Sequence, residues 1–182
     1  MNITVSLDNQ SYKRKPAKLD IAKISDRIAA CPCSYDIQEL ACKIGGEGHT
    51  FCPAVFREGK RKADNFVEMQ LFALDFDGGA AFGEIQNQAA RYHLPIAFAY
   101  STFSSTRKLA KFRVVFLNDV PVTDKHAAEI MIRMLLRIFN QADQSCADVS
   151  RMFFGGKGLI GHAGREAINI VGLMESFQRY IF

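Results

Sequence analysis

The chain has 182 residues, of which 48% are hydrophobic, and its formal net charge at pH 7 is +4. This length and apolar content suit one compact domain with a full core and do not suit a disordered chain. No stretch approaches the roughly 20 consecutive apolar residues of a membrane span, and the N-terminus lacks the basic-then-apolar pattern of a signal peptide, so we expect a cytoplasmic protein without membrane contact.

The basic residues are clustered rather than spread along the chain. The three clusters are Lys13, Arg14, Lys15 and Lys18; Arg57, Lys60, Arg61 and Lys62; and Arg107, Lys108, Lys111 and Arg113. One such cluster is more often a solvated face than a binding site, and the total charge is too small to indicate a polyanionic partner by itself. Three clusters with aromatic residues between them nevertheless suit a nucleic acid partner.

The five cysteines, an odd number, are expected to be reduced thiols in a cytosolic chain. Four of them and one histidine fall within 22 residues: Cys31, Cys33, Cys42, His49 and Cys52. Their spacing is C-x-C, then eight residues to the next cysteine, six to the histidine and two to the last cysteine, unlike the paired C-x2-C of zinc ribbons. This spacing disfavours a structural zinc ion and favours buried or incidental thiols.

The first third of the chain predicts a strand followed by helices. Alternation in the first residues indicates a short strand, and the helical spacing of Ile21, Ile24 and Ile28 indicates a helix. A second predicted helix is ended by Gly45 and Gly46. The elements expected here are a strand at 1–7, a loop at 11–18, helices at 20–30 and 35–44, a strand at 51–56 and a turn at 59–64.

From residue 65 the pattern becomes rich in strands. The elements expected here are strands at 66–77, 95–101, 111–117 and 150–156, helices at 82–93 and 124–141, and a closing strand and helix within 166–182. The apolar stripe of the helix at 124–141 indicates core packing. The order β-α-β-β-α-β predicts an α+β fold with a ferredoxin-like core of the RNA-recognition (RRM) type at 65–182, preceded by an N-terminal α/β part at 1–64.

Two aspartates, Asp75 and Asp77, end the most apolar predicted strand. Residues i and i+2 of a strand point to the same face, so the two carboxylates would lie side by side. Two unpaired carboxylates repel each other, and a divalent ion such as Mg²⁺ or Mn²⁺ removes that cost; pairs of these ions act in phosphoryl transfer. The pattern therefore favours a metal site over a strand end that simply faces water.

The same stretch matches the first motif of haloacid-dehalogenase-like phosphatases, an apolar run followed by D-x-D-G-[TV]. In that motif the first aspartate is a nucleophile and the second an acid or base. Three features disagree with this alternative: some 70 residues precede the motif, Gly79 stands where threonine or valine is expected, and no paired acidic motif ends a later apolar strand.

Polar groups downstream could serve a polyphosphate or a template. A hydroxyl-rich turn at 102–106 can hold phosphates, although such a turn is also an ordinary hairpin loop. The strand after it carries Lys111 and Arg113 on one face. Asp143 then precedes Arg151 by eight residues and Lys157 by fourteen. Alone, Asp143 could equally be a helix cap and Lys157 part of a mobile turn, so it is the order of these groups that is specific.

This order of motifs resembles the archaeo-eukaryotic primase (AEP) superfamily, and looks closest to primase-polymerase domains carried by plasmids, phages and other mobile elements. The motifs are D-x-D, a hydroxyl-rich turn leading into K-F-R-V-V-F, and D-x7-R before a small-residue turn with a lysine. The resemblance covers residues 49–158, including a lead-in at 49–66 before the first acidic motif.

The resemblance implies a role for each motif. Asp75, Asp77 and Asp143 would be catalytic ligands of two divalent ions, Mg²⁺ or Mn²⁺. The residues that would contact nucleotide or template are Ser104, Ser105, Arg113, Arg151 and Lys157. The second motif of the family carries a histidine that contacts the phosphates of the nucleotide, and in this chain Phe103 and Ser105 stand where it is expected.

The implied activity is template-dependent nucleotidyl transfer, by a DNA primase or DNA polymerase that adds nucleotides to a 3′-hydroxyl. The implied partners are nucleoside triphosphates, a single-stranded or primed DNA template bound mainly through its phosphates, and a helicase domain or protein. Primase domains of this kind are often the N-terminal piece of a longer replication protein. Because the histidine is missing, the alternative is a catalytically impaired relative that only binds nucleic acid or nucleotide, and the phosphatase is third.

Overall fold

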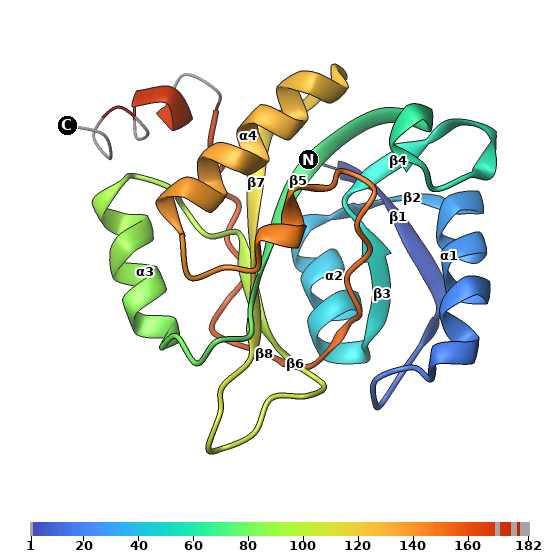
Figure 1. Cartoon of the computed structure of the whole chain (residues 1–182), viewed down its shortest axis with the longest axis horizontal. Helices are drawn as coiled ribbons and strands as arrows, with labels where there is room; N and C mark the ends of the chain where they lie inside the picture. Colours follow the sequence, from blue (N-terminus) through green and yellow to red (C-terminus); the bar gives the residue numbers. More distant parts are fainter. Residues whose placement is uncertain (1, 170–171, 176–177, 179–182) are drawn as a thin grey trace.

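The computed structural model describes residues 2–169, 172–175 and 178 and contains two antiparallel sheets (Figure 1). The three-stranded sheet has the order β2-β1-β3, and the five-stranded sheet has the order β4-β5-β7-β6-β8. The strands are β1 (Asn2–Ser11), β2 (Pro32–Asp36), β3 (His49–Cys52), β4 (Ala54–Phe56), β5 (Phe66–Phe76), β6 (Phe98–Thr102), β7 (Phe112–Val122) and β8 (Gly156–Leu159). The helices are α1 (Ile21–Ala30), α2 (Ile37–Ala41), α3 (Phe82–Arg91) and α4 (Lys125–Ile138). Within the described residues, no helix is both long and apolar enough to cross a membrane.

The N-terminal part contains the predicted first strand and helices, but with different bounds. β1 runs on to Ser11 instead of ending at residue 7, because its second half pairs with β3. The helix predicted at 35–44 is partly wrong, since Tyr35 pairs with Ile3 within the sheet. α2 begins only after Asp36, whose carboxylate accepts a hydrogen bond of 2.8 Å from the Gln38 N–H and caps the helix.

The same helix does not end at Gly45 and Gly46, as predicted, but continues through a π-helical turn, η2 (Cys42–Glu47). Gly45 packs against the larger sheet, where an added Cβ would lie 2.9 Å from the Cβ of Tyr100, so this glycine serves close packing. The turn ends at Gly48, whose φ of 88° lies in the left-handed region that glycine adopts without strain. η2 can thereby lie against β6 and β8.

The strand predicted at 51–56 is divided at Pro53 into two strands of different sheets. β3 pairs with β1, and β4 pairs with β5. Proline has no N–H to donate to a ladder, so it commonly marks the end of a strand. The two sheets therefore meet between Cys52 and Ala54, whereas the division of the chain at residue 64 stays a prediction.

The five-stranded sheet is covered on both faces (Figure 1). α3 and α4 lie on one face, and the three-stranded sheet with α2 and η2 lies on the other. β5, the second strand of the larger sheet, is buried from Met69 to Phe76. A strand that is buried on both faces needs apolar residues at successive positions, which accounts for the mainly apolar sequence from Met69 to Phe76, where Gln70 and Asp75 are the polar exceptions. Asp75 is the one charged residue in that run.

The predicted order β-α-β-β-α-β is present as β5-α3-β6-β7-α4-β8, but the last strand differs from its prediction. Residues 150–156 do not form it: they make an isolated bridge between Phe153 and Phe51, and β8 begins only at Gly156. β8 lies beside β6, whereas a ferredoxin-like core has its last strand beside its first. The chain is thus a mixed α/β fold with antiparallel sheets, and the specific RRM-like core is not confirmed.

The two later helices agree with their predictions, and Asp124 caps α4 by accepting a hydrogen bond of 2.7 Å from the Ala127 N–H. Of the strand and helix predicted within 166–182, the described residues contain a bridge from Ile168 to Asn118 and a helical turn at 172–175. The rest of that prediction lies outside the described residues.

The five cysteines are free thiols of different exposure, which gives a direct test of the fold. Cys42 is exposed, Cys31 and Cys33 are partly buried, and Cys52 and Cys146 are buried. Burial raises the pKa of Cys52 to about 12 and that of Cys146 to about 11, so neither presents a reactive thiolate at pH 8. We expect a chromogenic disulfide reagent to modify Cys42 first and the two buried thiols only on unfolding. If all five thiols react with the reagent in buffer as fast as they do in guanidinium chloride, this fold is contradicted.

Candidate functional site

The register of the five-stranded sheet brings three polar side chains into one row. Asp75 on β5 lies opposite Arg113 on β7, and Arg113 lies opposite Tyr100 on β6. Directly opposed residues of antiparallel strands point to the same face of the sheet. That face is the one toward the N-terminal part, because Tyr100 lies against Gly45 of η2.

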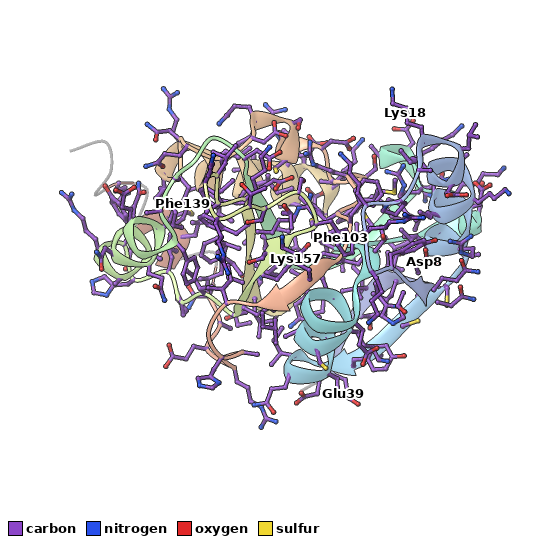
Figure 2. The ribbon with its side chains drawn as sticks, turned by 90° about the horizontal axis from the view of Figure 1, so that it is seen from below. Asp8, Lys18, Glu39, Phe103, Phe139 and Lys157 are labelled. Carbon is purple, nitrogen blue, oxygen red and sulfur yellow. The ribbon has the colours of Figure 1, made fainter. Side chains whose placement is uncertain are left out.

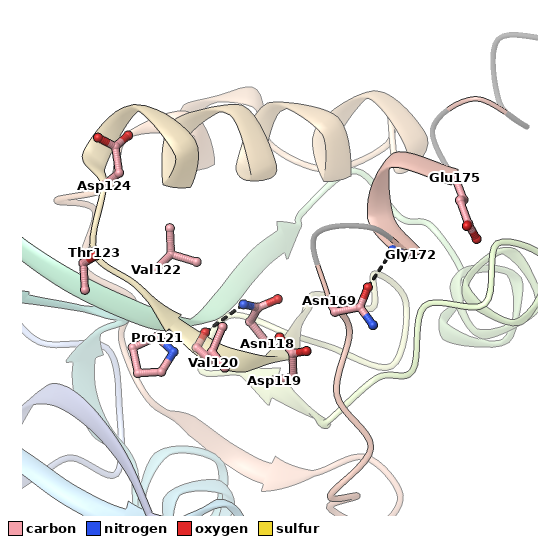
Figure 3. A pocket seen from close by; sticks show the side chains of 10 residues that line it. All are labelled: Asn118, Asp119, Val120, Pro121, Val122, Thr123, Asp124, Asn169, Gly172 and Glu175. Atoms are coloured by element: carbon pink, nitrogen blue, oxygen red, sulfur yellow. Dashed lines mark hydrogen bonds between the residues drawn. The ribbon is translucent and has the colours of Figure 1, made fainter.

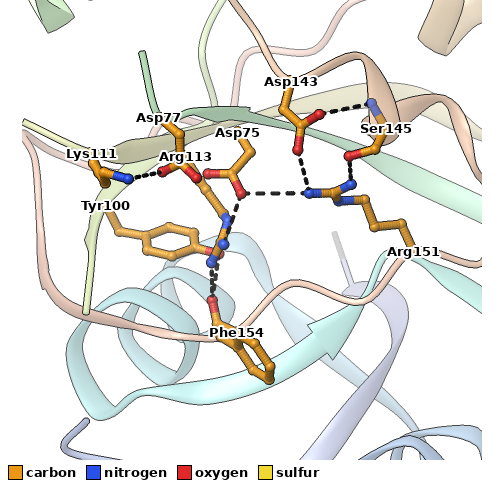
Figure 4. Close-up of polar contacts among 9 residues, drawn as sticks. All are labelled: Asp75, Asp77, Tyr100, Lys111, Arg113, Asp143, Ser145, Arg151 and Phe154. Carbon is orange, nitrogen blue, oxygen red and sulfur yellow. Dashed lines mark hydrogen bonds and ion pairs between the residues drawn. The ribbon is translucent and has the colours of Figure 1, made fainter. Parts of the chain in front are cut away.

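Asp75 and Arg113 form a buried ion pair (Figure 4). The Asp75 side chain is 4% exposed, and its Oδ2 accepts a hydrogen bond of 2.9 Å from Arg113 Nη2. Arg113 Nη1 and the Tyr100 hydroxyl both donate to the carbonyl of Phe154. Burial acts to lower the pKa of Arg113, but Tyr100 and Asp75 outweigh it and raise the pKa above its usual value, while burial raises the pKa of Tyr100 to about 12. At neutral pH Arg113 therefore stays cationic and Tyr100 neutral.

Asp77 follows Phe76, the last residue of β5, and lines the same pocket as Asp75. The register of β5 and β7, continued by one pair, places it opposite Lys111, whose Nζ lies 3.7 Å from Asp77 Oδ1. The Asp77 side chain is 51% exposed. Of the two strand-end carboxylates, Asp77 is therefore the one that a ligand can reach without disturbing the core.

Asp143 joins these aspartates through its backbone and through Arg151. Its N–H donates to the carbonyl of Asp75 at 2.8 Å, which ties the segment after α4 to the end of β5. Its carboxylate caps a short 3-10 turn by accepting from the Ser145 N–H at 2.9 Å, and it also accepts from Arg151 at 2.8 Å. Arg151 lies 3.7 Å from Asp75 as well. Hydrogen bonds from Ser145, aided by Arg151, hold the pKa of Asp143 below its usual value.

A pocket of about 190 Å³ lies in front of these side chains, between the larger sheet and the N-terminal part. The predicted site residues that line it are Asp75, Asp77, Ser104, Arg113 and Arg151. Its other lining residues are Lys15, Thr102, Phe103, Met152, Phe154 and Gly155. The sequence does not predict that Lys15 and Phe154 belong to the site. Lys15 is predicted only as a member of a basic cluster, and Phe154 only as part of a strand.

Three predicted site residues do not line this pocket. Asp143 contacts the pocket only indirectly, because its carboxylate is paired with Arg151, which lines the pocket. Ser105 and Lys157 contact each other beside it: the Lys157 ammonium donates to the Ser105 carbonyl, and the Ser105 hydroxyl accepts a hydrogen bond of 3.0 Å from the Lys111 N–H. Phe103, which stands where the AEP resemblance leads us to expect a histidine, does line the pocket and lies near the middle of the molecule in Figure 2.

The aspartates suit a divalent ion only in part. Among residues 2–169, 172–175 and 178, no three His, Cys, Asp or Glu side chains are grouped so as to hold a metal. However, Asp75 Oδ1 is buried and has no hydrogen-bond partner in that part of the chain, and Asp77 lines the same pocket. These two carboxylates are the candidate ligands of an ion, whereas Asp143 is paired with Arg151 and does not line the pocket.

The residues considered for zinc are divided among three places in the fold: Cys31 lies beside Cys33, Cys42 and His49 both contact Glu47, and Cys52 is buried elsewhere. The Sγ atoms of Cys31 and Cys33 lie 3.4 Å apart, Cys42 Sγ lies 3.9 Å from Glu47, and Cys52 donates to a backbone carbonyl. His49 hydrogen-bonds to the backbone of Asp8 and to the Glu47 carboxylate. Within the described residues they do not form one ligand set.

A larger cavity lies elsewhere in the described part of the chain (Figure 3). It measures about 750 Å³ and is formed by the end of β7, the start of α4 and described residues near the C-terminus. Its charged lining residues, among those described, are Asp119, Asp124 and Glu175. An acidic lining repels phosphate, so the smaller pocket beside Asp75 is the better site for a nucleotide.

Comparisons with known proteins agree with the AEP resemblance at the level of the fold. No protein-family model matches the chain, and no curated protein matches it. Among solved structures, the AEP domain (PP-N190) of the primase-polymerase (PrimPol) of cyanophage S-2L is similar, with 10% sequence identity and a TM-score of 0.56. The match covers 97% of this chain and 88% of the phage domain. The chain therefore has an AEP-like fold over almost its whole length.

Proposed function

We propose that this AEP-like chain is a template-dependent nucleotidyltransferase, a DNA primase or DNA polymerase that serves a plasmid, phage or other mobile element in the cytoplasm. The observation that supports it best is the pocket in which Asp75 and Asp77 lie beside Arg113 and Arg151. Carboxylates suit divalent ions, and guanidinium groups suit the phosphates of a nucleotide. The fold shared with a phage AEP domain fits the same reaction.

In this proposal Asp75 and Asp77 hold the ions, and Asp143 joins them when Arg151 turns away from it. Bound Mg²⁺ or Mn²⁺ supplies activation of the 3′-hydroxyl and neutralises charge on the pyrophosphate leaving group. Arg151, once released from Asp143, presents its guanidinium to the polyphosphate. Ser104 and the backbone N–H groups of its turn offer further donors to phosphate oxygens. A helicase partner stays a prediction from the resemblance.

The geometry disfavours the phosphatase alternative. That mechanism needs Asp75 as a nucleophile with an accessible carboxylate oxygen. Asp75 is instead buried, and its Oδ2 is paired with Arg113 at 2.9 Å and lies 3.7 Å from Arg151. Arg113 and Arg151 therefore hinder attack by Asp75 on a phosphate ester.

A relative that binds nucleotide or template without catalysis remains the second candidate. Phe103 and Ser105 offer no imidazole to the phosphates, and Asp143 is engaged by Arg151. The active enzyme is supported by the pocket itself, in which the accessible carboxylate of Asp77 lies beside Asp75 and two arginines.

Primer extension separates these candidates. The purified chain, a 5′-labelled primer on a longer DNA template and all four deoxynucleoside triphosphates are incubated with Mn²⁺, with Mg²⁺ or with a chelator. We expect the primer to lengthen by template-matched nucleotides with metal only. Binding of primed template and nucleotide without extension would indicate the inactive relative. Release of phosphate from a small phosphate ester, without extension, would indicate the phosphatase.

A further inference from the structure

The loop that follows β1 brings a lysine into the pocket beside the aspartates. Lys15 lines this pocket together with Asp75, Asp77, Arg113 and Arg151. It comes from the N-terminal part, whereas the other four residues come from the larger sheet or the segment after α4. The pocket is therefore completed by a residue outside the 49–158 region that carries the AEP resemblance.

Anchors on both sides hold this loop in place. Before Lys15, the Tyr12 N–H donates to the Gly48 carbonyl at 3.2 Å, and the Tyr12 hydroxyl accepts a hydrogen bond of 2.7 Å from Arg27. Directly after Lys15, Pro16 is buried and has a fixed φ. The backbone at Lys15 is therefore positioned by contacts that do not involve its own side chain.

The ammonium group of Lys15 lies over an aromatic ring at the edge of the site. Its Nζ is 6.0 Å from the centre of the Phe154 ring, a distance at the outer limit of a cation–π contact. The carbonyl of the same Phe154 accepts hydrogen bonds from Arg113 and Tyr100. One residue thus connects Lys15 to the polar row that contains Asp75.

Lys15 differs from the two arginines of the pocket in that its charge is not neutralised by a carboxylate in the described part of the chain. Arg113 is paired with Asp75, and Arg151 is paired with Asp143. The ion pairs found among the described residues do not include Lys15, and its side chain is exposed. Its charge can therefore meet an anion without breaking an existing pair.

We propose that Lys15 binds the polyphosphate of the incoming nucleoside triphosphate. The inference rests on the proposed function. Lys15 would supply the positive charge for the phosphates that Phe103 and Ser105, which stand where a histidine is expected, do not offer. The pocket, at about 190 Å³, is smaller than the roughly 300–1,000 Å³ of sites that enclose a whole small molecule. It suits phosphate groups, while the base and sugar lie outside it.

Calorimetric titration of three variants tests this inference on the purified chain. Lys15→Ala removes the charge, and Lys15→Arg keeps it. Lys18→Ala is the matched control, because Lys18 is an exposed lysine of the same basic cluster. Lys18 lies at the outer edge of the molecule, away from Phe103 (Figure 2). The ligands are deoxyguanosine triphosphate, deoxyguanosine monophosphate and a single-stranded oligonucleotide.

We expect Lys15→Ala to weaken binding of the triphosphate about tenfold, as for loss of one charged hydrogen bond, and to change binding of the monophosphate and oligonucleotide less than about twofold. Lys15→Arg and Lys18→Ala should bind the triphosphate like the wild type. Equal loss for Lys15→Ala and Lys18→Ala, loss of oligonucleotide binding alone, or a wild type that binds no triphosphate would overturn the inference. If Lys15→Ala extends primers normally and binds the triphosphate with unchanged affinity, the inference about Lys15 is wrong but the proposed function stands. If triphosphate binding depends on Lys15 but the wild type does not extend primers, the inference is supported and the proposed function fails.

Discussion

Replacing Asp75 with alanine is expected to lower the free energy of unfolding by about 3–5 kcal/mol, the range seen when one partner of a buried ion pair is removed. The reason is Arg113, which stays cationic in the folded chain because its pKa is raised, and which would lose its carboxylate partner at 2.9 Å. Arg113 would keep its hydrogen bond to the Phe154 carbonyl, so it cannot move into water without breaking that contact too. Urea unfolding followed by circular dichroism measures the change.

Two further variants show whether the loss comes from the unpaired arginine. In Asp75→Leu/Arg113→Met both charges are absent, and we expect at least half of the lost stability to return, because apolar replacements of buried pairs are often neutral or stabilising. Asp64→Ala is the surface control: its side chain is 93% exposed and 3.6 Å from Lys125, so its removal should cost less than about 1 kcal/mol. If Asp75→Ala is as stable as Asp64→Ala, the pair does not hold β5 to β7.

The centre of the site could be predicted because its pattern is local. An apolar run long enough for a strand buried on both faces ends at Asp75 and Asp77, and the period of two places both carboxylates on one face. The charged residues of the next hairpin then fall opposite them, since Asp75 pairs with Arg113 and Asp77 meets Lys111. Local sequence therefore decides which strands carry the site and which face it occupies.

The path of the chain into β8 could not be predicted in this way, because it depends on packing between segments far apart in the sequence. Residues 150–156 are apolar enough for a strand, but Gly155 lies so close to Gly48 that an added Cβ would be 2.3 Å from its carbonyl carbon. Because of this contact, residues 150–155 pass between the two sheets, and β8 begins only at Gly156. Nothing in either stretch of sequence indicates its partner.

The neutralisation of the carboxylates also escapes sequence reasoning, which expects repulsion between unpaired acids. Each predicted carboxylate has a cationic partner in the structure: Asp75 has Arg113, Asp77 has Lys111, and Asp143 has Arg151. The cluster is thus stable without an ion, and a metal must compete with basic side chains for it. This competition is weakest at Asp77, because an exposed pair at 3.7 Å contributes little.

Asp77→Asn is therefore the substitution that best separates catalysis from folding. It leaves the shape and exposure of the side chain nearly unchanged but removes the charge that a divalent ion requires. The bound ions are expected to stabilise the transition state by several kcal/mol. Loss of one of their ligands should therefore reduce the rate of primer extension roughly 100- to 1,000-fold. The free energy of unfolding should change by less than about 1 kcal/mol, since only the exposed contact with Lys111 is lost.

Asp64→Asn is the matched control for this comparison, because Asp64 is also an exposed aspartate paired with a lysine, but it does not line the pocket. It should extend primers like the wild type. Raising the Mn²⁺ concentration should recover part of the activity of Asp77→Asn if the substitution weakens metal binding, and none if the carboxylate has no contact with the ion. Wild-type rates for Asp77→Asn at low Mn²⁺ would remove Asp77 from the proposed metal site and leave Asp75 as the only carboxylate among the described residues that line the pocket.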